Sequence, residues 1–154
     1  MDPARLLPHA PPMRLITRVV EIAGDRARAV GRIGPTVPGA DGRTAPAVLG
    51  IELGAQCAAL IGAALIGAAV IEAESVASGV EATDTLPDAA RVGHLVSIRS
   101  ATFTTAFLPV DRDLDAVARR VGGAGGLELF EVAIRTDPEG EPTVRATIGT
   151  MLAR

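Results

Sequence analysis

One carboxylate, Glu52, lies near the start of the most apolar segment of this 154-residue chain. The segment, residues 47–74, carries no other charge before Glu72, and Gln56 follows Glu52 by four positions. Residues four apart share one face of a helix. A carboxylic acid held away from water favours its neutral form, which suits a proton donor. The segment is therefore either a membrane span or a buried helix whose acid does chemical work.

The composition of residues 53–71 favours the buried helix. Much of this stretch is Ala and Gly, so each residue gains little on transfer into lipid, and no Arg lies close outside either end to set an orientation. A helix that is apolar on every side is one surrounded by protein. We predict a helix from Ala47 to Gly67 or Ile71.

The start of this helix has the residues of a helix cap. Thr44 or Ala45 is the predicted cap, with Pro46 in the first turn, where a missing N–H is tolerated. The preceding residues 34–46 form a loop, and residues 72–91 form a polar surface connection.

The rest of the chain has the pattern of an antiparallel sheet. In residues 26–33 arginines alternate with small residues, which is typical of a strand with one face buried against a closely packed helix. The glycine-rich residues 122–126 lie between two strands and open no helix, so they predict a hairpin turn rather than a phosphate loop. Strands are predicted at 14–22, 26–33, 93–103, 112–121, 126–137 and 142–152.

The order β-β-α-β-β-β-β predicts one α+β domain over residues 1–154, with an antiparallel sheet wrapped around one long central helix. A single sheet layer leaves an edge strand open, and pairing of edges across a two-fold axis is the usual remedy. We therefore expect a homodimer or a higher homo-oligomer.

Composition excludes several other classes of protein. The net charge is −3, and all fifteen basic residues are Arg without a basic stripe, so nucleic-acid binding is not expected. The N-terminus has no secretory signal, and we expect a cytoplasmic protein that does not enter a membrane. The one cysteine, Cys57, excludes an internal disulfide and a thiolate-rich zinc site, and its apolar setting predicts a buried, inert thiol.

Three segments of the sequence resemble those of a known family. "LLPHAPPMRLITRVVEI" and "PAVLGIELGAQ" are similar to the motifs of the 3-hydroxyacyl-acyl-carrier-protein dehydratases of the hotdog superfamily. "VGHLVSIRSATFTTAFLP" (92–109) is similar to the branch found with aryl polyene pigment synthesis. The likeness covers most of the chain and implies a hotdog fold.

The resemblance also implies site residues. Glu52 matches the catalytic acid of the family, Gln56 its helix glutamine, and His9 the histidine of its N-terminal motif. Ala47 lies where the family often has glycine. The catalytic histidine that the main family has upstream of the helix is missing from residues 34–46, so the base must be His9 or His94.

Dehydration of a 3-hydroxyacyl thioester needs a base, an acid and donors for the thioester oxygen. The expected roles are Glu52 as general acid and His9 as base. Free N–H groups of Ala47 and Val48 at the positive end of the helix would bind the oxyanion. Gln56 would orient Glu52 or contact the substrate. No metal or other cofactor is expected, because the phosphopantetheine arm arrives with the acyl carrier protein or coenzyme A substrate.

Each of these residues also has a structural interpretation. Glu52 would stabilise the helix dipole, Gln56 would make structural hydrogen bonds, and His9 and His94 would be ordinary turn or strand residues. Arg99 is assigned no role. Two other functions are open. A hotdog thioesterase would use the helix carboxylate to activate water, and a non-catalytic acyl-binding partner subunit would not need the missing histidine.

Overall fold

The structure, a computed structural model, describes residues 2–77 and 93–152. Nine elements follow a short 3-10 turn, η1 (Pro3–Arg5). The helix is α1 (Leu49–Ala77). The strands are β1 (Ile16–Ala23), β2 (Arg26–Gly31), β3 (Thr44–Pro46), β4 (Gly93–Phe103), β5 (Phe107–Pro109), β6 (Leu114–Ala124), β7 (Leu127–Arg135) and β8 (Val144–Leu152).

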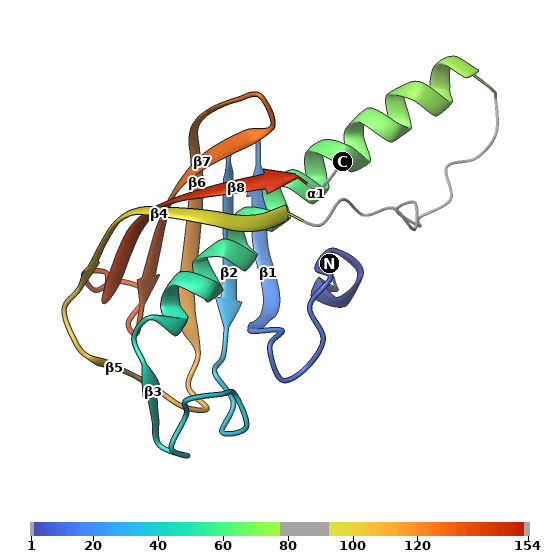
Figure 1. Cartoon of the computed structure of the whole chain (residues 1–154). Coiled ribbons are helices and arrows are strands. Elements are labelled where there is room, and N and C mark those ends of the chain that lie inside the picture. The colour runs from blue at the N-terminus through green and yellow to red at the C-terminus, as the bar shows by residue number, and fades with distance from the viewer. Residues whose placement is uncertain (1, 78–92, 153–154) are drawn as a thin grey trace.

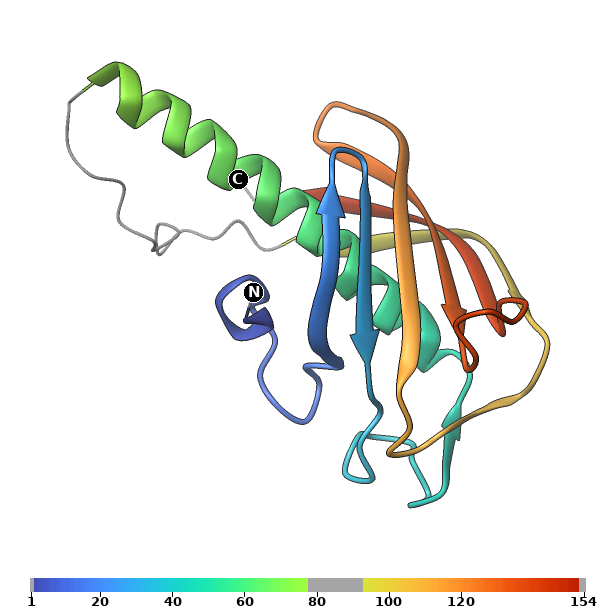
Figure 2. The same ribbon diagram turned by 180° about the vertical axis from the view of Figure 1, so that it is seen from behind.

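Six strands form one antiparallel sheet in the order β1-β2-β6-β7-β8-β4. The sheet curves around the first half of α1, whose second half continues beyond the sheet, as Figures 1 and 2 show from opposite sides. This is the arrangement predicted from the sequence, and all six predicted long strands are present within a few residues of their expected bounds.

Small residues let the helix lie directly on the sheet. Ala27 and Ala29 are fully buried on the inner face of β2, as the alternation with arginine predicted. A Cβ atom built on Gly54 of the helix would lie 2.8 Å from the Cβ of Val132 on β7. One built on Gly31 of β2 would overlap a methyl carbon of Leu53. The separation of helix and sheet is therefore set by residues that lack a side chain.

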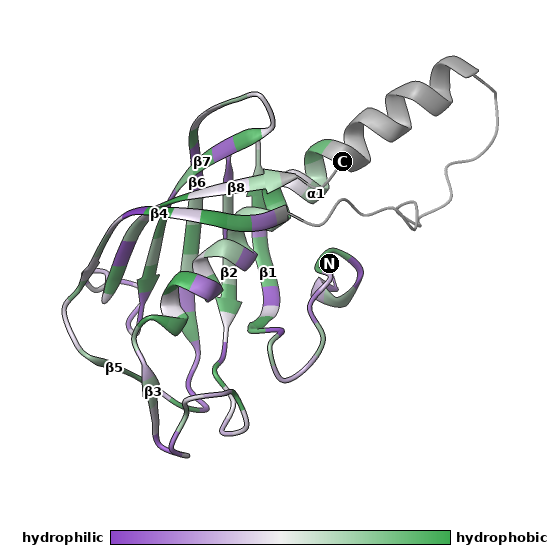
Figure 3. Cartoon of the chain, in the orientation of Figure 1, coloured by the Kyte–Doolittle hydropathy of each residue, from purple (hydrophilic) through white to green (hydrophobic). Residues whose placement is uncertain are grey.

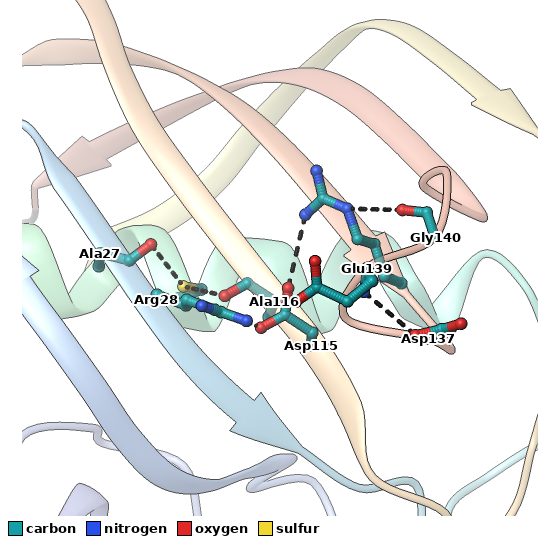
Figure 4. Close-up of polar contacts among 9 residues, drawn as sticks. Ala27, Arg28, Asp115, Ala116, Asp137, Glu139 and Gly140 are labelled. Atoms are coloured by element: carbon teal, nitrogen blue, oxygen red, sulfur yellow. Dashed lines mark hydrogen bonds and ion pairs between the residues drawn. The ribbon is translucent and has the colours of Figure 1, made fainter.

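A buried charge links three neighbouring strands on the outer face. Asp115 of β6 is 6% exposed, and its Oδ1 accepts from Nε of Arg28 on β2 at 2.6 Å. Its Oδ2 lies 3.5 Å from Nη1 of Arg135 on β7, which also donates Nε–H to the Gly140 carbonyl (Figure 4). The hydrogen bond to Asp115 raises the pKa of Arg28. The two contacts of Asp115 thus link β6 to its neighbours β2 and β7 on the face of the sheet that points away from the helix.

The helix start differs from the prediction. Residues 44–46 are not a cap but the strand β3, in which Ala45 is paired with Leu108 of β5. The Thr44 hydroxyl cannot cap a helix because it lies 3.0 Å from the Asp41 carboxylate, which also accepts the Thr44 N–H. Pro46 is accordingly in a strand rather than in the first helical turn.

The helix end and one turn also differ. The helix continues to Ala77, so residues 72–77 are helical, and residues 78–91 of the predicted connection lie outside the described residues. Gly122 and Gly123 belong to β6, and the turn proper is Gly125-Gly126. Both turn residues have positive φ, 63° and 89°, which a two-residue hairpin of this kind requires.

The cysteine is buried where helix and sheet meet. The Cys57 thiol is fully buried and lies 3.6 and 3.5 Å from the Ala27 and Ala116 carbonyl oxygens, the two acceptors labelled in Figure 4. Burial raises its pKa to about 12.

We expect no reaction of native Cys57 with a thiol reagent at pH 8, because only ~10⁻⁴ of the thiol is ionised there. The measurement is reagent absorbance before and after unfolding in guanidinium, with one thiol appearing only after unfolding. Rapid modification of the native chain would contradict this burial.

Candidate functional site

The first turns of the helix place Glu52 beside the N-terminal segment. The Ala47–Val48 turn between β3 and α1 is anchored by the Ala47 N–H, which donates to the Ala106 carbonyl at 2.9 Å. The Gly50 and Ile51 N–H groups close this turn on the Ala47 and Val48 carbonyls, both at 2.9 Å. Glu52 follows in the first turn of α1.

The histidine reaches Glu52 because the N-terminal segment folds back. The N–H groups of Met13 and Arg14 both donate to the Ala10 carbonyl, which forms a turn before β1, and buried Leu7 packs into the core. In this fold Nε2 of His9 lies 3.2 Å from Oε1 of Glu52. The N-terminal turn therefore lies against the helix start, and the catalytic role of His9 stays a prediction.

Gln56 joins these two parts of the chain. Its Oε1 accepts the N–H groups of Leu15 at 2.9 Å and Ile16 at 3.4 Å. Its Nε2 donates to the Met13 carbonyl at 2.6 Å and to Oε1 of Glu52 at 2.9 Å. The side chain is fully buried. Of the two roles predicted for Gln56, the arrangement supports orientation of Glu52, because a buried amide with all four positions occupied has none left for a substrate.

Glu52 is less enclosed than the sequence suggested. The side chain is 28% exposed, and His9 beside it is 31% exposed. Its Oε1 oxygen accepts an N–H group of Gln56 and lies 3.2 Å from Nε2 of His9. The carboxyl group thus lies at the boundary of the core, where one oxygen is held by the protein and the side chain still reaches solvent.

Of the two N–H groups predicted to bind the thioester oxygen, those of Ala47 and Val48, one is already hydrogen-bonded within the protein. The Ala47 N–H is used by the Ala106 carbonyl, so the expectation of a free amide there is wrong. The cause is the pairing of β3 with β5, which the sequence pattern does not predict and which ends at Pro46, beside Ala47. Within residues 2–77 and 93–152 the Val48 N–H has no hydrogen-bond partner, and the Val48 side chain is 56% exposed. Its role in binding a thioester oxygen stays a prediction.

The second histidine is elsewhere. His94 is exposed at the start of β4, opposite Met151 of β8, and Arg99 is exposed further along the same edge strand. In the part of the chain that the structure describes, no hydrogen bond or ion pair joins either of them to Glu52. Of the two histidines, the structure brings only His9 to the acid.

Among the described residues, no three His, Cys, Asp or Glu side chains are grouped so that they could hold a metal ion. No helix in the same residues is long and apolar enough to cross a membrane.

Solved structures with the same fold include both dehydratases and thioesterases. The dehydratase heterocomplex ApeI:P from Xenorhabdus doucetiae aligns with a TM-score of 0.71 at 19% identity, over 100% of this chain and 92% of that chain. An uncharacterized protein from Pyrococcus horikoshii aligns with a TM-score of 0.61 at 12% identity, over 97% and 92% of the two chains. A hypothetical thioesterase with coenzyme A from Streptococcus pneumoniae TIGR4 aligns with a TM-score of 0.58 at 12% identity, over 88% of this chain and 84% of that chain. These likenesses establish the hotdog fold.

Sequence comparison narrows the family within that fold. No curated protein matches the chain. Residues 1–153 match the ApeP-like family, which is described as ApeP dehydratase. Since this match spans nearly the whole sequence, the chain belongs to the ApeP-like family of dehydratases.

Proposed function

We propose that the protein dehydrates 3-hydroxyacyl thioesters carried by acyl carrier protein, in the synthesis of aryl polyenes or related acyl chains. The contact between His9 and Glu52, held by Gln56 at the start of α1, is the observation that carries the proposal. It places a carboxylate, which is a group suited to proton transfer, against an imidazole and an amide that fix its position. The family match supplies the reaction class.

The reaction needs no redox step and no added nucleophile. A proton leaves the carbon next to the thioester, the hydroxyl leaves with a proton as water, and a double bond forms between the two carbons. The Val48 N–H at the helix start is the proposed donor to the thioester oxygen. The phosphopantetheine arm comes with the substrate, and the reaction proposed here uses no metal.

We also propose that β4 is the edge through which the chain assembles, as a two-fold dimer of its own copies. Four large apolar side chains on this edge strand are exposed by 38–49%: Leu95, Val96, Ile98 and Phe103. Figure 3 shows the hydrophobic colour along part of β4. An open apolar edge of this length pairs readily with another strand.

A partner subunit without chemistry of its own is the second candidate. One observation favours it: the solved dehydratase with the same fold is described as a heterocomplex. In that case the chain would bind an acyl thioester or a catalytic subunit and would turn over nothing alone.

One set of assays separates the candidates. The purified chain is given enoyl and 3-hydroxyacyl thioesters on acyl carrier protein and on coenzyme A, and both enoyl absorbance and free thiol are followed. We expect absorbance to change without thiol release. Thiol release alone would identify a thioesterase, and tight binding without either change would identify a non-catalytic subunit. Buried Cys57 contributes no thiol signal.

A further inference from the structure

The Gln56 amide has only one consistent orientation. Two backbone N–H groups, of Leu15 and Ile16, face one end of the amide, and the Met13 carbonyl faces the other. The two backbone N–H groups need an acceptor, which is the amide oxygen, and the Met13 carbonyl needs a donor, which is the amide nitrogen. A flipped amide would place its N–H groups against the backbone N–H groups and its oxygen against the carbonyl oxygen. Gln56 therefore presents an N–H to Oε1 of Glu52, and this oxygen is an acceptor.

The surroundings of the two ring nitrogens of His9 decide which of them carries the proton. Nδ1 of His9 is buried and has no hydrogen-bond partner among the described residues. A buried N–H without an acceptor is costly, and an unfilled acceptor is the more commonly tolerated state. The proton of neutral His9 therefore lies on Nε2, and this nitrogen lies 3.2 Å from Oε1 of Glu52.

Both neighbours thus hold the same oxygen of Glu52. Oε1 faces the Gln56 and His9 N–H groups, whereas Oε2 has no hydrogen-bond partner among the described residues. In this arrangement the lone pair of His9 is on the buried Nδ1 and cannot take a proton from a substrate. The exchangeable position of the site is Oε2.

We propose that Glu52 carries both proton transfers of the dehydration through Oε2, and that His9 and Gln56 are positioning residues that hold Oε1. This rests on the proposed function. Oε2 first takes the proton from the carbon next to the thioester, whose electron pair moves toward the thioester oxygen. The pair then forms the double bond as the C3–O bond breaks, and the departing hydroxyl takes the same proton from Oε2. Water and the enoyl thioester leave, and Glu52 is again ionised.

This assignment differs from the roles expected from the sequence, in which His9 is the base and Glu52 only the acid. The difference is testable because a glutamine at position 9 can donate an N–H to Oε1 but cannot act as a base. His9→Gln should keep kcat within about tenfold of wild type, which is the scale of one hydrogen bond. His9→Leu, which removes the donor, should lose more. If His9 is the base, His9→Gln loses about 10²–10⁴-fold, which would overturn the proposal.

The role of Gln56 has its own kinetic test. Gln56→Met keeps the length of the side chain and removes all four hydrogen bonds. We expect kcat to fall about tenfold or more, with KM unchanged, because the buried side chain does not contact the substrate. A raised KM with an unchanged kcat would assign Gln56 to substrate binding and contradict its positioning role. Melting curves show whether the variant is folded at the assay temperature.

A spectroscopic test does not depend on activity. Long-range ¹⁵N–¹H NMR identifies the protonated nitrogen of an imidazole, and the His94→Gln variant leaves His9 as the only histidine signal. At pH 8 we expect the Nε2–H form, and a predominant Nδ1–H form would refute the proposed hydrogen bonding. If wild type shows no dehydration in any assay while His9 is in the Nε2–H form, the proposed function fails and the proton arrangement stands.

Discussion

Glu52→Gln is expected to lower kcat by about 10³-fold or more while the protein keeps its fold. In the mechanism proposed above, the proton that moves is carried by this carboxyl group, and general acid–base catalysis contributes about 10²–10⁴-fold. The amide oxygen of the variant can still accept the N–H groups of Gln56 and His9, so the packing around the site is retained. Enoyl thioester absorbance measures the loss, and a melting curve measures the fold.

The matched control is Glu131→Gln. Glu131 is exposed on β7 and its removal changes the net charge by the same amount. We expect wild-type turnover from it. If Glu52→Gln turned over normally, Glu52 would have no part in the mechanism, and the remaining role would be the favourable position of an acid near the start of a helix.

Gly54→Val should destabilise the protein by about 3 kcal/mol, the upper end for a side chain forced into a packed core. A Cβ at this position would lie 2.8 Å from both Cβ and Cγ2 of Val132. Both contacts involve the stiff upper part of a β-branched residue, so the helix itself must move. Urea unfolding followed by circular dichroism measures the difference in the free energy of unfolding.

Gly62→Ala is the control on the same helix. Among the residues that the structure describes, no atom lies within 4 Å of a Cβ at position 62, so the substitution should stabilise the protein by about 0.5–1 kcal/mol through helix propensity. A Gly54→Val protein as stable as wild type would show that helix and sheet are not in direct contact. Because Glu52 is two residues from Gly54, a displaced helix should also lower kcat.

The strands and the helix were predictable because each has one dominant periodic pattern. In β2 arginine alternates with residues that are buried against the helix, and this signal depends on no distant partner. The short strands β3 and β5 were missed because three residues carry no period, and their pairing of Ala45 with Leu108 joins segments far apart in the sequence. Because β3 was not predicted, the helix was expected to start at Ala47, whereas it starts at Leu49.

The site was predictable in its members and less so in its hydrogen bonds. The motifs pointed to His9, Glu52 and Gln56, and the structure brings all three together. The sequence could not show that Leu15 and Ile16 orient the Gln56 amide, since those donors are backbone groups with no signature of their own. It also could not show that the Ala47 amide is taken by Ala106.

The exposed edge of β4 has a consequence for the single chain as it folds. Strands with unpaired edges and apolar side chains are starting points for aggregation, and natural proteins protect them with charged residues. From Leu95 to Phe103 the sequence offers one charge, Arg99, which is exposed in the middle of the strand. The charge of Arg99 is therefore the one feature between Leu95 and Phe103 of the kind that disfavours unwanted pairing of an open edge.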